Sequence, residues 1–323
     1  MVGTVAKKEK KKEKKKVYKV DTLSWAEQDN LLVIDVSAVM RSHFIPMEQP
    51  FGANYGFRRE PLTHEVNGET VNTSAIFGLL RLFQKYQKVK TDYIFCFDTP
   101  KNMLKAIDKN YKAGRVKMNN EYFDQVNTVY KILQESGYTV LAMDGFEADH
   151  MVVEAVNQNK TLYDNIGVVT NDMDLSHLVC DNVHLLNALV KDTDVSRTNY
   201  VEALKCPYNA ILLKKCMVGD KSDNVTGIFR FGEVAFTKFL QDELLVTEDY
   251  KVKGAIRGFE REIIQNAETL SDDKKGQALH ALDLILPLPV QIDARANTEI
   301  NNMFMVSALK KYGMTSLVGL FQS

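Results

Sequence analysis

Short, uninterrupted runs of apolar residues recur along the first two hundred residues of the chain. Such runs suit strands that are buried on both faces, as in a parallel sheet. We expect five of these strands, at residues 31–34, 93–97, 138–142, 168–170 and 183–186. Between them, segments with apolar residues on one helical face lie at residues 74–83, 120–136 and 147–157. This alternation predicts an α/β fold, with a mostly parallel, twisted, doubly wound sheet and helices on both faces.

From about Tyr200 the pattern becomes helical. Residues 209–218 are apolar-periodic, residues 219–228 interrupt them, and a second helix is expected near Gly232. Later helices, near residues 253–267, 274–284 and 298–311, have the pattern of packing elements. We therefore predict a disordered basic tail (1–20), an α/β core (21–200) and a helical domain (201–323).

Two stretches of the core differ from this pattern. Residues 45–72 are rich in Pro, Gly and Asn and are expected to form a long irregular loop. Residues 101–117 are strongly basic, and Lys101, Lys105, Lys109 and Lys112 recur at helical intervals. The spacing predicts a helix with one basic stripe, which is either a solvated face or a contact surface for phosphates.

The net charge of −1 hides an asymmetry, because residues 7–16 alone carry a net charge of +6 and the rest of the chain −7. The tail is compatible with a solubilising arm, a phosphate-binding arm, a nuclear signal or an engineered addition. An acidic body is unusual for a nucleic-acid-binding protein unless many of its acids bind metals. The four cysteines are widely spaced, and neither a secretory signal nor a long apolar run is present. We expect reduced thiols and a cytoplasmic protein that does not contact a membrane.

Carboxylates follow the predicted strands, and others lie in the interruption of the helical region. They are Asp35, Asp98, Glu147, Asp149, Asp172, Asp174, Asp220 and Asp223. Each alone is typical of a helix cap or loop. The carboxyl ends of parallel strands meet at one edge, where ligands bind. Carboxylate oxygens suit Mg²⁺ or Mn²⁺, and two ions about 3.5–4 Å apart support phosphodiester cleavage.

Three other chemistries fit the sequence poorly. A phosphatase with an Asp35 nucleophile would prefer an acid where Ser37 stands. Zinc would require closely spaced His and Cys, whereas the six histidines are scattered. The chain also lacks a Gly-rich phosphate loop that ends in Gly-Lys-Ser/Thr.

The sequence resembles the 5′-nuclease family, which includes flap endonucleases, the 5′-exonuclease domains of bacterial DNA polymerase I and phage enzymes of the ribonuclease H type. The matching motifs occur in family order between about residues 31 and 240. They are Val33-Ile34-Asp35, Phe97-Asp98, Tyr111-Lys112 with Arg115, Gly145-Phe146-Glu147-Ala148-Asp149, Thr170-Asn171-Asp172-Met173-Asp174 and Gly219-Asp220-Lys221-Ser222-Asp223-Asn224.

The resemblance implies a role for each group of residues. One Mg²⁺ would be held by Asp35, Asp98, Glu147 and Asp149, and a second by Asp172, Asp174 and Asp223 with Asp220 nearby; Mn²⁺ would substitute. A helical arch near residues 100–120 would use Lys105, Lys112 and Arg115 at the scissile phosphate, with Tyr111, Lys101 and Lys109 binding nucleic acid. A helix–three-turn–helix module over residues 209–240 would grip the duplex through Gly227, Arg230 and Gly232, with a potassium ion in its loop.

Two positions depart from the family pattern. His150 replaces a second Asp after Glu-Ala-Asp, and Arg230 replaces the middle glycine of the duplex-binding loop. We assign His150 a structural or outer-shell role, because imidazole is a softer ligand than Mg²⁺ prefers.

The resemblance implies a Mg²⁺-dependent 5′–3′ exonuclease or flap endonuclease of replication or repair, monomeric and in the cytoplasm of a phage's bacterial host. It would act on DNA with 5′ flaps or ends, on RNA primers and on RNA–DNA hybrids, alongside a polymerase or a single-strand-binding protein. The alternatives are a DNA-junction binding protein with vestigial catalysis and a PIN-like ribonuclease, although the latter lacks a duplex-gripping module.

Overall fold

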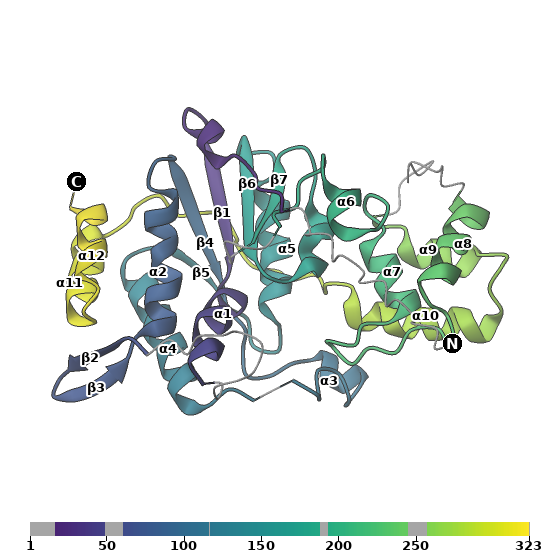
Figure 1. The fold of residues 1–323 in the computed structure, drawn as a ribbon, viewed down its shortest axis with the longest axis horizontal. Coiled ribbons are helices and arrows are strands. Elements are labelled where there is room, and N and C mark those ends of the chain that lie inside the picture. The colour runs from purple at the N-terminus through teal and green to yellow at the C-terminus, as the bar shows by residue number, and fades with distance from the viewer. Residues whose placement is uncertain (1–16, 49–60, 116, 188–192, 245–256, 323) are drawn as a thin grey trace, which may run out of the picture.

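A computed structural model describes residues 17–48, 61–115, 117–187, 193–244 and 257–322. At its centre is a five-stranded parallel sheet with the order β5-β4-β1-β6-β7 (Figure 1). Its strands are β1 (Asn30–Asp35), β4 (Thr91–Cys96), β5 (Thr139–Leu141), β6 (Asn165–Thr170) and β7 (Val183–Asn187). Each coincides with one of the apolar runs, because a strand covered on both faces needs apolar residues at every position.

Helices cover both faces of the sheet. Leu32 and Ile34 of β1 point into a core formed with α1 (Val36–Glu48), α2 (Ser74–Tyr86) and α4 (Asn120–Glu135). The alternate residues Leu31 and Val33 join a second core, formed with α5 (Ala148–Asn159), the 3₁₀ helix η2 (Met173–Leu178) and α6 (Tyr200–Leu204). The predicted doubly wound α/β class is confirmed.

The prediction of an irregular loop over residues 45–72 is wrong at both ends of that range. Its first residues belong to α1, and its end is a hairpin of β2 (Thr63–Val66) and β3 (Glu69–Asn72). The hairpin turns at Asn67 and Gly68, whose φ angles are 54° and 85°. Both positions thus have the positive φ that a tight type I′ turn requires. Residues 49–60 of the expected loop lie outside the described residues.

The prediction of a continuous helix over residues 101–117 is also wrong. Only α3 (Leu104–Ile107) forms, followed by turns up to about Arg115. Lys112 has φ of 55°, which is incompatible with a right-handed helix. The predicted basic stripe is therefore broken, and the lysines point to different surroundings.

A helical module follows the sheet. It contains α7 (Ile211–Val218), α8 (Glu233–Leu244), α9 (Glu260–Asn266) and α10 (Asp272–Ile285), which share a third core. Leu104 and Tyr111 from the preceding layer are buried in the same core. The segment around α3 is therefore packed against this module.

The chain then returns to the sheet, so the predicted assignment of residues 201–323 to one helical domain needs correction. Val290 and Ala294 join the second core, and α11 (Asn302–Lys311), α12 (Thr315–Val318) and the 3₁₀ helix η3 (Gly319–Phe321) complete the first. Figure 1 shows α11 and α12 beside α2, at the end of the molecule opposite α8 and α9. These helices bury their apolar faces on the α/β layer.

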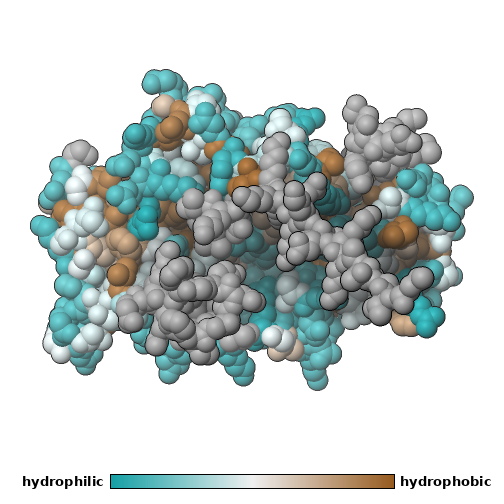
Figure 2. Space-filling model, in the orientation of Figure 1, coloured by the Kyte–Doolittle hydropathy of each residue, from teal (hydrophilic) through white to brown (hydrophobic). Residues whose placement is uncertain are grey.

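The remaining domain prediction, the basic tail, falls largely on residues 1–16, outside the described part of the chain. Among the described helices, none is long and apolar enough to cross a membrane. Figure 2 shows mostly hydrophilic residues on the visible face, with small hydrophobic areas between them.

Candidate metal centre

Carboxylates gather at the carboxyl edge of the sheet because three neighbouring strands end there. Asp35 is the last residue of β1, and Cys96, two residues before Asp98, is its register partner in β4. On the other side β6 ends at Thr170, two residues before Asp172. Since β1 lies between β4 and β6, these three acids come from adjacent strand ends.

Asp35 is buried at this edge and held by two hydrogen bonds. Its carboxylate accepts from the Ala38 backbone N–H at 3.0 Å and from the Thr170 hydroxyl at 2.8 Å. Burial, with the nearby charges of Asp98 and Asp172, raises the pKa of Asp35 to about 7 despite those hydrogen bonds. A cation bound beside this carboxyl group would favour its ionised form and lower its pKa.

The amino end of α5 supplies two more acids. Burial, followed by the charge of Asp172, raises the pKa of Asp149 well above its ordinary value. Glu147 precedes the helix and accepts hydrogen bonds from the Tyr111 hydroxyl at 3.0 Å and the Lys112 ammonium at 2.7 Å. The residue at the helix start thus connects the sheet edge to the segment after α3.

A second group of acids joins the sheet edge to the helical module. One carboxylate oxygen from each of Asp174, Asp220 and Asp223 lies within 4.8 Å of the others. Asp174 lies in η2, whereas Asp220 and Asp223 lie after α7, in a loop closed by backbone hydrogen bonds of 2.9 and 2.8 Å between Asp220 and Val225. Three carboxylates at this spacing fit a hard divalent cation.

Ammonium and guanidinium groups lie between these carboxylates. Lys112 contacts Glu147 and also reaches Asp223 at 3.6 Å, and Arg115 binds Asp223. Burial alone would lower the pKa of Lys112, but the charges of Asp149, Glu147 and Asp223 raise it above its ordinary value. Lys112 therefore stays charged within the site.

Lys215 of α7 is a site residue that sequence reasoning missed. Its ammonium binds Asp174 and lies 2.6 Å from an Asp220 oxygen. Burial opposes the ionisation of Asp220, but hydrogen bonds from Lys215 and Ser222 hold its pKa below the ordinary value. The available signal was a pair of lysines, Lys214 and Lys215, in a helix whose other residues are apolar, five residues before Asp220.

The other basic residues of the predicted arch lie apart from the acids. Lys101, Lys105 and Lys109 are exposed, and Lys101 pairs with Asp144 at 2.6 Å. In the part of the chain that the structure describes, Lys105 and Lys109 form no ion pair. Their roles at nucleic acid stay predictions.

His150 lies next to the acids but serves the helix. Its Nδ1 accepts a hydrogen bond from the Glu147 backbone N–H at 3.3 Å, and its ring packs edge-on against Phe146. Burial lowers the pKa of His150, which favours the neutral ring that this contact requires. The geometry agrees with a structural role.

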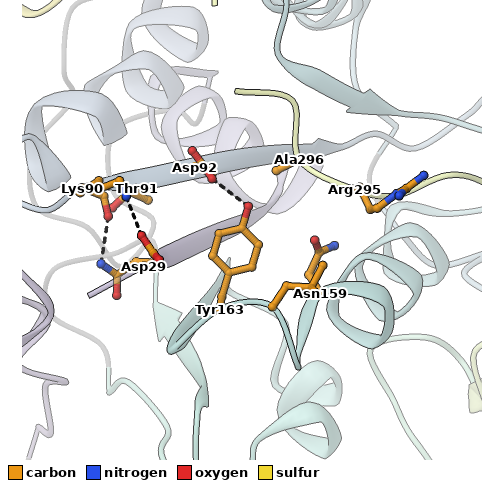
Figure 3. A pocket seen from close by; sticks show the side chains of 10 residues that line it. Asp29, Lys90, Thr91, Asp92, Asn159, Tyr163, Arg295 and Ala296 are labelled. Atoms are coloured by element: carbon orange, nitrogen blue, oxygen red, sulfur yellow. Dashed lines mark hydrogen bonds and ion pairs between the residues drawn. The ribbon is translucent and has the colours of Figure 1, made fainter. Parts of the chain in front are cut away.

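A cavity of about 350 Å³ lies elsewhere, at the amino ends of β1 and β4 (Figure 3). Its polar groups pair with one another: Lys90 with Asp29 at 2.6 Å, and the Tyr163 hydroxyl with Asp92 at 2.8 Å. Ligands of such sheets bind at the opposite edge. The acid cluster is therefore the better candidate site.

Comparisons with known proteins find relatives of this chain among bacterial DNA polymerases and 5′–3′ exonucleases. DNA polymerase I of Caldicellulosiruptor bescii is 28% identical over 77% of this chain and 30% of its own length. A 5′–3′ exonuclease of Buchnera aphidicola (Schizaphis graminum) is 28% identical over 56% of this chain and 64% of its own length. The chain thus spans less than two thirds of the length of these relatives.

Solved structures share the fold. The T5 5′-exonuclease with bound zinc aligns with a TM-score of 0.53 and 15% identity, over 91% of this chain and 97% of that one. The catalytic core of Rad2 in complex with DNA substrate aligns with a TM-score of 0.52 and 14% identity, over 94% and 95% of the two chains. The model of the 5′–3′ exonuclease N-terminal resolvase-like domain matches residues 30–205, which contain six of the eight acids. This chain therefore belongs to the 5′–3′ exonuclease family.

Proposed function

We propose that this protein is a Mg²⁺-dependent 5′-nuclease that hydrolyses phosphodiesters at or near the 5′ ends of DNA. The observation that carries the proposal is the cluster of carboxylates at the carboxyl edge of the sheet, with Lys112, Arg115 and Lys215 among them. An all-carboxylate donor set suits Mg²⁺ better than zinc.

Eight acids would hold two ions, divided as the family resemblance suggests. Asp35, Asp98, Glu147 and Asp149 would hold one, and Asp172, Asp174 and Asp223 the other, with Asp220 nearby. Bound ions would neutralise the phosphate and supply a nucleophile at neutral pH. Mn²⁺, another oxygen-preferring cation, would substitute.

The cations of the site would act on the substrate phosphate. Lys112 and Arg115, which pair with Glu147 and Asp223 in the metal-free site, would bind phosphate oxygens if metal ions neutralised these carboxylates. Lys105, together with Lys101 and Lys109, would guide the single-stranded 5′ end. Tyr111, also expected to bind nucleic acid, is instead buried in the third core with its hydroxyl on Glu147, so it would position that acid. Affinity should then fall steeply with salt, because each neutralised phosphate releases counterions.

The loop between α7 and α8 would bind the duplex. Gly227 and Gly232 let the backbone approach a phosphate closely, and Arg230 adds a charge. A potassium ion in this loop is part of the proposal. So are RNA primers and RNA–DNA hybrids as substrates, a polymerase or single-strand-binding protein as partner, a monomeric state and action in the cytoplasm.

The direct test uses a labelled duplex with a 5′ flap, incubated with Mg²⁺ or with EDTA. Short products that need Mg²⁺ are expected, whereas a shifted but uncut duplex would favour a DNA-junction binding protein. Running RNA, hybrid and DNA substrates side by side establishes the substrate preference.

Asp172→Asn tests the metal assignment. We expect cleavage to fall by more than about a hundredfold, because loss of a ligand should exceed the effect of losing an outer-shell partner. DNA binding should be retained. Asp181→Asn is the control, since Asp181 is exposed and pairs with Arg197 away from the cluster. Near-normal turnover in Asp172→Asn would rule out the two-metal assignment.

A further inference from the structure

The turn that follows α3 is joined by two hydrogen bonds to the loop that follows α7. The Lys112 backbone N–H donates to the Asp223 carbonyl at 2.8 Å. The Asn224 side-chain amide donates to the Asn110 carbonyl at 2.9 Å, across 114 positions of the sequence. Two segments that are distant in the chain are therefore tied together beside the acid cluster.

The loop that carries Asp223 and Asn224 has a fixed shape. Asp220 and Val225 exchange both of their backbone hydrogen bonds, at 2.9 and 2.8 Å. The Asp220 carboxylate also accepts the Ser222 backbone N–H at 2.8 Å. Asn224 has φ of 57°, a left-handed conformation that asparagine tolerates better than most residues. Its side-chain amide is thus presented from a rigid support.

On the other side of the joint, Lys112 adopts a conformation that a lysine ordinarily avoids. Its φ is 55°, where Cβ crowds the following carbonyl oxygen. Such residues persist where their surroundings hold them, and they gather at functional sites. The Asp223 carbonyl holds the Lys112 N–H, and the preceding Tyr111 is buried in the third core. The contact from Asn224 is a further hold on the same strained turn.

The Asn110 carbonyl can accept the Asn224 amide without giving up its place in the turn. It also accepts the Ala113 backbone N–H at 3.0 Å. A carbonyl oxygen has two lone pairs, so the Asn224 amide takes the second acceptor position. The Asn110 N–H in turn donates to the Asp108 carboxylate at 2.8 Å. The contact from Asn224 therefore completes the turn and does not compete with it.

The turn directs the Lys112 side chain into the acid cluster. Its ammonium lies 2.7 Å from a Glu147 oxygen and 3.6 Å from an Asp223 oxygen, and only 9% of the side chain is exposed. These ion pairs use carboxylate oxygens that the proposed metal ions would take. The two hydrogen bonds of the joint use a backbone carbonyl and a side-chain amide instead. Metal binding thus leaves their donors and acceptors available to hold the turn.

We infer that Asn224 is a positioning residue, which holds the turn at residues 110–112 so that the Lys112 ammonium meets the substrate phosphate. This inference rests on the proposed function, in which Lys112 binds a phosphate oxygen. Without the Asn224 amide the strained turn would relax, and the ammonium would move away from that phosphate. A misplacement of about 1 Å can lower a rate about a hundredfold.

The first test compares Asn224→Gly with the wild type. Glycine keeps the left-handed backbone and removes only the amide. With a labelled 5′-flap duplex in Mg²⁺, we expect kcat to fall about tenfold to a hundredfold and KM to change less than about twofold. Asn67→Gly is the matched control, because Asn67 is also exposed, has φ of 54° and lies in the hairpin of β2 and β3. It should cleave at the wild-type rate.

A double variant tests whether Asn224 acts through Lys112. Lys112→Met alone should lower kcat, because it removes the ammonium. Adding Asn224→Gly to Lys112→Met should change kcat by less than about twofold, since residues that act as one unit do not have additive effects. A double variant in which the two separate effects multiply would overturn the inference.

Amide hydrogen exchange gives a readout that does not need cleavage. In metal-free Asn224→Gly, the Lys112 N–H should exchange about fivefold faster than in the wild type, as expected for the loss of one hydrogen bond. Exchange in the central strand β1 should be unchanged, which distinguishes release of the turn from a general loss of stability.

The outcomes separate this inference from the proposed function. If the wild type cleaves but Asn224→Gly keeps the wild-type kcat, or leaves the exchange of the Lys112 N–H unchanged, the positioning role alone is refuted. If the wild type does not cleave in Mg²⁺, the proposed function fails, while the exchange rate of the Lys112 N–H still decides whether Asn224 holds the turn.

Discussion

Positively charged side chains occupy the spaces between acids where metal ions are proposed to bind. Lys215 lies between Asp174 and Asp220, and Lys112 between Glu147 and Asp223. Without such partners, clustered buried carboxylates would repel one another or take up protons. We conclude that these lysines stabilise the site before metal binds and compete with the metal.

Lys215→Met should separate these two effects. The metal-free protein should lose about 1–3 kcal/mol of unfolding free energy, because the variant leaves two acids without their cation. Its Mg²⁺ affinity should rise several-fold, since no ammonium has to be displaced. Thermal melting and calorimetric titration measure the two quantities.

Lys214→Met is the matched control for that experiment. Lys214 precedes Lys215 in α7, yet it pairs with the largely exposed Glu233. Such pairs contribute little, so its Mg²⁺ affinity should stay at the wild-type value. A weaker Mg²⁺ affinity in Lys215→Met would show that the ammonium assists the metal instead of competing with it.

At the scale of elements, the loop after α7 depends on a close backbone approach. A Cβ atom added at Gly227 would lie 2.4 Å from the Gly219 backbone nitrogen and 2.5 Å from the Met217 carbonyl oxygen. Neither atom can move without shifting the loop that carries Asp220 and Asp223. The residues proposed to bind the duplex and those proposed to bind metal thus lie in one segment of the chain.

Gly227→Ala should therefore lower both stability and Mg²⁺ affinity. We expect a loss of about 1–3 kcal/mol, as for overpacked sites, measured by chemical denaturation. Gly276→Ala is the contrasting substitution, because nothing lies within 4 Å of the added methyl in α10. It should stabilise the protein by about 0.5–1 kcal/mol. Equal effects of the two substitutions would contradict the close-approach argument.

Local sequence signals predicted most of these elements and failed where distant contacts decide. The strands followed from their apolar runs, and the Asn67-Gly68 hairpin signal was present but obscured by the composition of the loop around it. The helical spacing of Lys101 to Lys112 misled, because the Lys112 side chain is drawn to Glu147, 35 residues further along. A buried ion pair between residues distant in the sequence can thus override the local preference for a helix.

At the scale of the whole molecule, the acids could be located but not their partners. Parallel topology places strand ends together, so the acids after β1, β4 and β6 were predictable at one edge. An amphipathic pattern reveals that a helix has an apolar face, but not which surface covers it. The return of α11 and α12 to the α/β layer, and the approach of Lys215 to Asp174, depend on tertiary packing alone.

The acid cluster also makes a prediction about the whole protein's stability. Asp35, with a pKa of about 7 instead of 3.8, and Asp149, with its raised pKa, hold protons when the protein is folded and free of metal. Between about pH 4 and pH 7 these carboxyl groups are ionised in the unfolded chain but still protonated in the folded one. The metal-free protein should thus lose stability as pH rises through this window.

Mg²⁺ should oppose that loss, because it binds the ionised carboxylates and competes with protons. The increase in melting temperature on adding Mg²⁺ should therefore be larger at about pH 8 than at about pH 5. Burial lowers the pKa of His177 to about 3, which gives the opposite pH trend. The contribution of His177 to stability should be nearly the same with Mg²⁺ and with EDTA, so it largely cancels when the two samples are compared at the same pH. In Asp35→Asn the Mg²⁺ effect should be smaller and depend less on pH. An equal Mg²⁺ effect at both pH values in the wild type would mean that protons and metal do not share these carboxylates.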